Sequence, residues 1–470
     1  MTNQPKKAEN RHKSAVLNNK KLPSYFLSLE LENVLCFKER QEINLSDSNG
    51  HPAQWTVILG NNGVGKTTLL RCLAGMGIGF VHIDEENNSF ANPLLFEFLN
   101  NPKSLWLWQE IGVLQDHGAK VKSYLISGNN LLEINKLKNI EFTRSNIEMF
   151  VEAGGYIGEG LGAGLGGLRG LICYGYGATR RMGKASLIDS HLSENSASLF
   201  SDDTLLLNAE EWLLQTDYAV KSSSGKIRSY FKKQFEQIVE ILKRILPDVD
   251  DIRIAPVDED RNRPTAEFLT PYGWVQLSSL GLGYRTTIAW MVDLAVRLFK
   301  RYPDSEDPLA EPAIVLVDEI DLHMHPKWQR TIMEFLTQRF PNTQFIVTAH
   351  SPLVVQAAQD ANIVLLRREG DRVVIDNNPE IIDNWRVDQV LTSVFEIPSA
   401  RPAFLDPLLT RRQEILSKPK LSKADKVELK DLEAKIGSLP TAETSEDIKA
   451  MDIIRRAAKL LEKSDAEAVE

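Results

Sequence analysis

A glycine-rich segment, GNNGVGKTT, carries the residue types that proteins use to hold phosphate groups. Gly60, Gly65, Lys66 and Thr67 match the spacing GxxxxGKT, after the apolar run WTVILG and before the helical run KTTLLRCLAGM. Glycines let backbone amides curl around phosphates, and the start of a helix adds partial positive charge. We therefore expect Lys66 to neutralise the β- and γ-phosphates of ATP and the Thr67 hydroxyl to bind Mg²⁺. The residues expected to surround the nucleotide here are Asn61, Asn62, Gly63, Val64, Gly65, Lys66, Thr67 and Thr68.

Two later apolar runs, AIVLVDEID and FIVTAHSP, end in polar residues that suit phosphate chemistry. We expect Asp318 to bind Mg²⁺ and Glu319 to activate water. His350 is expected to contact the γ-phosphate and the attacking water, the alternative being a histidine packed in the core. The nearby HxH of DLHMHP has no third ligand in view, so we do not expect it to bind a metal.

These side chains need a parallel sheet to bring them together, because sites of open α/β sheets lie at the carboxyl ends of the strands. We predict an α/β ATPase head built from residues 25–78 and 271–400. Between its parts, residues 79–270 form an inserted mixed and helical lobe with a glycine-rich loop, and no sustained heptad repeat that would make a long coiled coil. Residues 401–470 are predicted to be a helical C-terminal extension, and residues 1–24 a disordered basic tail.

Composition excludes several classes of protein. The chain has 55 Lys and Arg against 64 Asp and Glu, a net charge of −9, which argues against nucleic-acid binding by the surface as a whole. A local basic turn or the basic tail is still allowed. The three cysteines fit neither a disulfide framework nor a zinc site, and the first residues lack the apolar core of a signal peptide. We expect a cytoplasmic protein with no membrane partner.

The order of these motifs resembles the ABC-type ATPases, the class that includes the SMC proteins. The resemblance implies a P-loop ABC-type head that binds ATP and Mg²⁺ and forms a head-to-head dimer, in which a signature segment reaches the partner's nucleotide. LGLGYR aligns best with that segment, so Gly281, Gly283 and Arg285 are the expected contacts. Gly281 stands where the family has serine, which puts efficient hydrolysis in doubt, although Ser278 or Ser279 could substitute in a shifted register.

Two other positions are left open by the sequence. ABC-type ATPases have a glutamine that should follow the strand of ICYGYGATRR in this chain. No such glutamine is evident there. Arg180 or Arg181 there could contact a phosphate or a partner, or form a solvated basic turn. Phe37 could stack on adenine, although a buried core position is favoured.

Among ABC-type proteins, the chain most resembles the ATPases of Septu antiphage systems. The resemblance rests on GNNGVGKTT, GYGATRR, LGLGYR, VDEIDLHMHP and VTAHSP. It implies self-assembly beyond a dimer and a separate HNH nuclease subunit, through which the complex cuts phage or foreign DNA. The helices after residue 405 are candidates for docking that subunit, or they pack on their own core. No nuclease metal motif is visible after His350.

Two alternatives stay open. One is an ATPase that repairs or organises chromosomes without a nuclease. The other is the ATPase subunit of a membrane transporter, which the long insert and the YGATRR turn disfavour.

Overall fold

The computed structural model describes most of the chain outside several segments. The described residues are 23–78, 120–127, 138–143, 173–184, 195–257, 262–358, 360–379, 386–395, 397, 399, 401–418 and 422–436. The glycine-rich loop of the inserted lobe, residues 154–170, lies outside these ranges. So does the expected N-terminal tail except for its last residues, where Ser24 already begins a strand. The chain divides into two compact units, residues 1–390 and 391–470, which are described separately.

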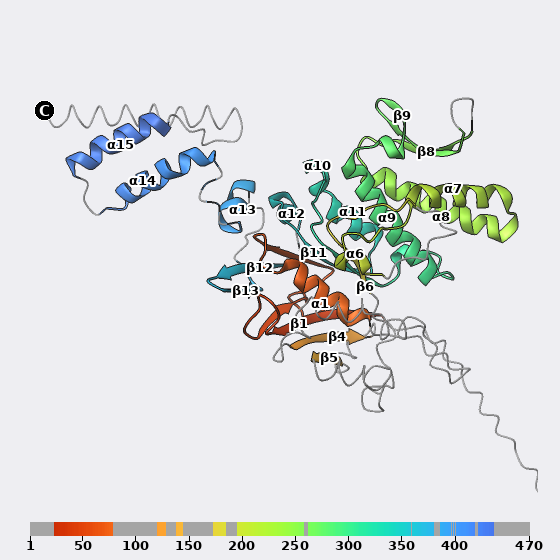
Figure 1. The fold of residues 1–470 in the computed structure, drawn as a ribbon, viewed down its shortest axis with the longest axis horizontal. Coiled ribbons are helices and arrows are strands. Elements are labelled where there is room, and N and C mark those ends of the chain that lie inside the picture. Colours follow the sequence, from red (N-terminus) through yellow and green to blue (C-terminus); the bar gives the residue numbers. More distant parts are fainter. Residues whose placement is uncertain are drawn as a thin grey trace, which may run out of the picture. The chain divides into compact units, whose positions relative to one another are not determined.

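A six-stranded mixed sheet forms the centre of the first unit (Figure 1). Its strand order is β13-β12-β3-β11-β10-β6; β13 is antiparallel to β12, and every other pairing is parallel. The predicted α/β fold is therefore present. All residues of β3, β10 and β11 are buried, as expected for central parallel strands covered on both faces. The strands are β3 (Trp55–Gly60), β6 (Cys173–Tyr176), β10 (Ala313–Val317), β11 (Thr343–Thr348), β12 (Asn362–Glu369) and β13 (Arg372–Asp376).

A four-stranded antiparallel sheet, ordered β2-β1-β4-β5, lies below helix α1 in Figure 1. Its strands are β1 (Ser24–Glu32), β2 (Gln41–Asn44), β4 (Lys120–Ser127) and β5 (Lys138–Thr143). Helix α1 (Lys66–Ile78) shares one apolar core with strands of both sheets. Gln344 of β11 also joins the sheets, because its side chain exchanges hydrogen bonds of 2.9 and 2.8 Å with the backbone N–H and C=O of Phe26.

Between β6 and β10, the chain forms helices and a small sheet. The helices of the predicted inserted lobe are α7 (Ala209–Ser222) and α8 (Gly225–Ile245), after the short α6 (Ala197–Phe200). The small sheet has the order β7-β8-β9, with β7 (Asp251–Ala255), β8 (Thr265–Thr270) and β9 (Gly273–Gln276). A 3-10 turn, η2 (Leu277–Ser279), precedes the long helix α9 (Leu282–Arg301), whose residues 286–299 are all buried.

Short helices also lie between α9 and the C-terminal unit. They are η3 (Pro308–Ala310), α10 (Pro326–Gln329), α11 (Ile332–Arg339), α12 (Pro352–Ala357) and α13 (Val387–Ser393).

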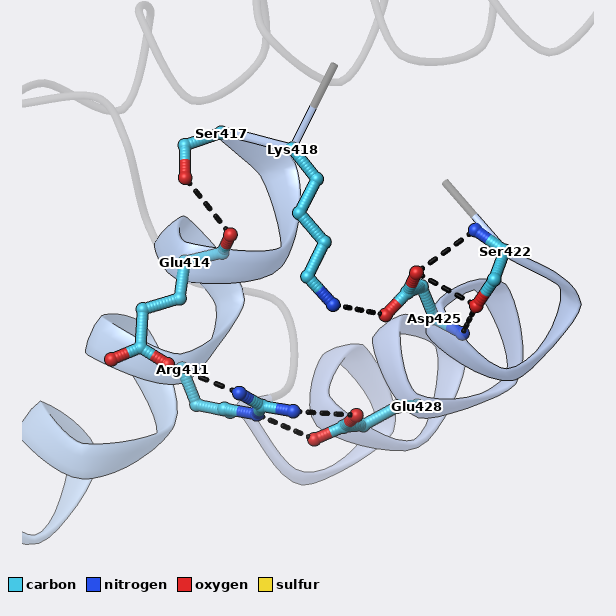
Figure 2. A network of polar contacts seen from close by, with 7 residues as sticks. All are labelled: Arg411, Glu414, Ser417, Lys418, Ser422, Asp425 and Glu428. Carbon is cyan, nitrogen blue, oxygen red and sulfur yellow. Dashed lines mark hydrogen bonds and ion pairs between the residues drawn. The ribbon is translucent and has the colours of Figure 1, made fainter. Parts of the chain in front are cut away.

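The second unit contains η4 (Ala403–Leu405), α14 (Asp406–Leu416) and α15 (Lys423–Ile436), which agree with the predicted charged helices. Arg411 bonds both carboxylate oxygens of Glu428, and Lys418 bonds Asp425 at 2.6 Å (Figure 2). The hydrogen bond from Lys418 holds the pKa of Asp425 below its usual value. The first of these ion pairs therefore joins α14 to α15, and the second joins α15 to the chain that follows α14.

Candidate functional site

The predicted phosphate loop lies between β3 and α1, as its spacing requires. Gly60, Gly63 and Gly65 have φ angles of 146°, 79° and 89°, in the range that favours glycine. A Cβ at Gly65 would lie 2.5 Å from the Cys36 sulfur, and one at Gly60 would lie 2.7 Å from the Leu366 carbonyl oxygen. Backbone conformation therefore favours glycine at all three positions, and packing also requires it at Gly60 and Gly65.

Lys66 turns its ammonium group back into the loop. Its Nζ donates to the carbonyl oxygens of Gly60 and Asn61 at 2.8 and 2.9 Å. Burial lowers the pKa of Lys66, while Asp318 acts in the opposite direction. The loop thus holds a cation among backbone groups, where an anionic phosphate would meet it.

A hydrogen-bonded cluster connects this loop with the ends of two strands. Thr67 Oγ1 at the start of α1 donates to Asp318 Oδ2 at 2.7 Å. Thr348, the last residue of β11, donates to Asp318 Oδ1 at 2.6 Å and accepts the Glu319 N–H at 2.7 Å. The two residues expected to bind Mg²⁺ are therefore adjacent, and their hydroxyl and carboxylate oxygens are donors that Mg²⁺ prefers. Thr348 was not among the predicted site residues, and its only signal in the sequence is its place at the end of an apolar strand two residues before His350.

Glu319 and His350 meet beside this cluster. His350 Nε2 lies 4.0 Å from Glu319 Oε1, and the side chains are 31% and 35% exposed. The backbone N–H of His350 lies 3.2 Å from Asp321 Oδ2. Burial, and then the nearby positive charge of Lys66, lowers the pKa of His350. His350 is therefore not packed in the core, and the structure places it next to the carboxylate with which it was expected to act.

Arg180 holds the backbone of the same segment. Its side chain is 2% exposed, and Nη1 and Nη2 donate to the carbonyl oxygens of Asp318 and Glu319 at 2.9 and 2.8 Å. Burial lowers the pKa of Arg180 to about 10. A solvated turn is therefore the wrong interpretation for Arg180, and it fits only the exposed Arg181. Both Arg180 and Glu319 have positive φ angles, 38° and 48°, a conformation that is costly for residues with side chains.

A buried polar network ties α9 to β6, the strand that precedes Arg180. The Tyr176 hydroxyl donates to Asp293 Oδ2 at 2.9 Å, and Arg297 Nε donates to the same oxygen at 2.6 Å. Asp293 Oδ1 accepts the Leu207 N–H at 3.2 Å. Since β6 ends at Tyr176, helix α9 and the turn bearing Arg180 are anchored to each other.

The signature-like segment lies at the start of α9. The helix begins at Leu282, which favours the register LGLGYR over one shifted to Ser278 or Ser279. A Cβ at Gly283 would lie 2.2 Å from the His323 carbonyl oxygen, whereas at Gly281 the nearest atom would be 3.9 Å away. Packing therefore does not exclude serine at Gly281. Among the described residues, no hydrogen bond or ion pair joins Gly281, Gly283 or Arg285 to Lys66 or Asp318.

Phe37 and the HxH of DLHMHP are two other positions that the sequence singled out. Phe37 is fully buried, with its ring against Gly65, so it is a core residue and offers no exposed face to adenine. His325 accepts the Lys327 N–H as a helix cap. Within the described ranges, no group of three or more His, Cys, Asp or Glu residues is arranged to hold a metal ion. Those ranges also contain no helix that is long and apolar enough to span a bilayer.

Comparison with domain families matches both sides of this site. Residues 28–150 match a family described as "AAA domain", and residues 187–356 match one described as "AAA domain, putative AbiEii toxin, Type IV TA system". The first match includes the phosphate loop, and a P-loop ATPase domain implies ATP binding.

Three curated proteins have similar sequences. "Retron Vc95 probable ATPase" of Vibrio cholerae serotype O1 biovar El Tor is 37% identical over 31% of this chain and 27% of that protein. "Retron Ec83 probable ATPase" of Escherichia coli is 32% identical over 47% of this chain and 37% of that protein. "Septu protein PtuA" of Bacillus mycoides (strain KBAB4) is 24% identical over 84% of this chain and 48% of that protein. The chain thus spans about half, or less, of the length of these relatives.

Solved structures give a weaker likeness. An SMC head bound to the C-terminal winged-helix domain of ScpA has a TM-score of 0.39 and 14% identity, over 75% of this chain and 97% of that one. The SMC head domain from Thermotoga maritima has a TM-score of 0.35 and 13% identity, over 75% of this chain and 99% of that one.

The two adjacent arginines allow a matched test of the buried contact. Arg180→Met removes two charge-assisted hydrogen bonds and leaves two carbonyls without them, so we expect the free energy of unfolding to fall by about 3 kcal/mol. Arg181→Met at the exposed neighbour should change it by less than about 0.5 kcal/mol. Urea unfolding of both variants measures the difference, and equal effects would contradict the assigned contacts.

The histidine offers a second test. A pKa below 6.5 means that the folded state favours neutral His350, so its contribution to stability is complete above pH 6.5 and is lost as the pH falls toward the lowered pKa. Lys66→Met removes one cause of the shift and should raise the pKa of His350 toward its ordinary value. Histidine NMR titration, assigned with His350→Gln, measures the change. Lys38→Met, at an exposed lysine paired with Asp371, is the control that should leave the titration as in the wild type.

Proposed function

We propose that this P-loop ATPase, which is related to Septu PtuA and to retron ATPases of antiphage defence, is the ATP-binding subunit of a DNA-cutting defence complex. Its nucleotide state regulates a partner HNH nuclease that degrades phage or foreign DNA. The observation that carries the proposal is the cluster of Thr67, Asp318, Thr348 and Glu319 beside the phosphate loop.

The chain's own residues divide the work at the phosphates. Lys66 and the amides of the loop bind the β- and γ-phosphates, since they supply positive charge at the start of α1. Thr67 and Asp318 would hold Mg²⁺, which would neutralise phosphate charge. Glu319 accepts a proton from the attacking water, and His350, kept neutral by its lowered pKa, accepts or donates a hydrogen bond near the γ-phosphate.

Two heads sandwich the nucleotide in the proposed assembly. Gly281, Gly283 and Arg285 of one head face the phosphates held by the other, and further contacts build a larger oligomer. Gly281 has no hydroxyl to offer the γ-phosphate, so turnover is slow and ATP acts mainly as a signal. The space around Gly281 supports a functional reason for the missing hydroxyl, because packing would admit a serine.

The C-terminal unit is the proposed docking surface for the nuclease. Several of its large apolar side chains are exposed: Phe404 by 73%, Leu416 by 49% and Val427 by 71%. Apolar groups held in water by a rigid helical pair are typical of a contact surface. The ion pairs between α14 and α15 keep that surface in shape.

Point variants separate ATP binding from turnover. Lys66→Ala should abolish ATP binding, because it removes the cation at the phosphates. Glu319→Gln should leave ATP binding intact, and its main effect should be on a rate of hydrolysis that is already slow. A fluorescent ATP analogue and a phosphate-release assay measure the two steps. Fast wild-type turnover that Glu319→Gln destroys would show that the inference from Gly281 is wrong.

Docking is tested by co-expression with an HNH protein encoded by a neighbouring gene. The two proteins should copurify, and truncation after residue 410 should abolish the complex because it removes most of α14 and all of α15. ATP binding by the truncated chain is the control for a folded head. If the truncated chain still captures the nuclease, the pair of helices α14 and α15 is not the docking surface.

A further inference from the structure

The helical hairpin of α7 and α8 carries a local charge opposite to that of the chain. Residues 218–235, YAVKSSSGKIRSYFKKQF, contain five Lys and Arg and no Asp or Glu, in a protein of net charge −9. These residues include the connection between α7 and α8 and the first half of α8. The two helices pack side by side (Figure 1). We call residues 218–235 the basic tip.

The cations of the basic tip are available to a ligand. Lys221 pairs with Asp217 and Lys232 with Glu236, both at exposed surface. Lys226, Arg228 and Lys233 are exposed and form no ion pair among the described residues. The hairpin therefore presents positive charge that its own carboxylates do not neutralise.

Large apolar side chains are interleaved with these cations. Tyr218 is 71% exposed, Ile227 61% and Tyr230 41%. Lys226, Tyr230 and Lys233 stand at i, i+4 and i+7, which places them on one face of α8 with the aromatic ring between the two cations. The two lysines are separated by about 10 Å along the helix, roughly the axial rise of three phosphates in one strand of a duplex.

We infer that the basic tip binds the sugar-phosphate backbone of a nucleic acid. The lysines contact phosphates and release counterions, and Tyr230 lies against a sugar or an unstacked base. An ordinary solvated helix face gains nothing from exposed aromatic rings between cations, whereas such rings are the usual partners of bases in strand-binding proteins. The net negative charge of the chain as a whole disfavours spreading of the polyanion over the rest of the surface. Only the biological role of the basic tip rests on the proposed function. That role is to give the DNA-cutting complex a DNA contact on this chain.

Charge reversal at one face of α8 tests the inference on the full chain. The probes are a labelled DNA duplex and one of its single strands, with binding followed by fluorescence anisotropy over a range of salt concentrations. Lys226→Glu with Lys233→Glu should weaken binding of the duplex about tenfold or more, and the slope of log K against log salt should become shallower by about 2. Tyr230→Ala should weaken binding of the single strand about fivefold.

Helix α15 offers a matched control. Lys423, Val427 and Lys430 have the same i, i+4, i+7 spacing on an exposed helix, but an aliphatic residue replaces the ring and Asp425, Glu428 and Asp431 surround them. Lys423→Glu with Lys430→Glu makes the same change in net charge and should leave affinity and salt slope as in the wild type. Binding of the ATP analogue, unchanged in both double variants, shows that the head is folded.

Three results would overturn the inference. The first is that the wild-type chain binds neither probe at low salt. The second is that the α8 reversal leaves affinity and salt slope unchanged. The third is that the α15 reversal weakens binding as much as the α8 reversal does. The proposed function fails by a separate route, through loss of ATP binding or of the nuclease complex, which these probes do not report.

Discussion

Both carboxylate oxygens of Asp318 are bonded to threonine hydroxyls from different elements, and the rest of the site depends on this arrangement. Thr67 belongs to the start of α1 and Thr348 to the end of β11, while Asp318 follows β10. Asp318 is only 6% exposed, and a buried carboxylate is costly unless hydrogen bonds satisfy it. Strand order makes these bonds possible, since β10 and β3 flank β11 and parallel strands end at the same edge. One charged group thereby fixes the phosphate loop against two strand ends.

Left-handed backbone conformations gather around that carboxylate. Three are glycines of the loop, and two are Arg180 and Glu319. Conformations of this kind cost about 1 kcal/mol or more for residues with side chains, and they persist when surrounding contacts determine them. The guanidinium of Arg180 supplies such contacts, since it donates hydrogen bonds to the carbonyl oxygens of both Asp318 and Glu319. Arg180 also follows the strand that Tyr176 ties to α9 through Asp293. The helix that begins with the signature-like segment is thus connected by hydrogen bonds to the backbone of the expected catalytic carboxylate.

Rigid and exposed surfaces are separated in the first unit. Residues 286–299 of α9 are buried, yet Leu282 at its start is 50% exposed. Helix α8 shows the same division, with a buried face toward its C-terminal end and exposed cations and aromatic rings toward its beginning. In both helices the packed part fixes the direction of the part that faces solvent. A fold of this kind can present a nucleotide contact and a polyanion contact on elements that do not bend independently of the core.

Sequence alone was enough for the α/β class, the phosphate loop, the two strand ends with Asp318 and His350, and the helices of the inserted lobe and the C-terminus. These features depend on residues close together in the chain, where spacing and backbone preference act directly. For Phe37 the sequence already favoured the core, and the structure confirms it. The roles of Thr348 and Arg180 and the bridge from Gln344 to Phe26 depended on tertiary structure. Arg180 and Arg181 are neighbours of the same type, and only the packing of β6 beside β10 turns one into the core and the other to solvent. Contacts between segments hundreds of residues apart leave no local pattern, because the free energy that selects them comes from burial and hydrogen bonding across the assembled sheets.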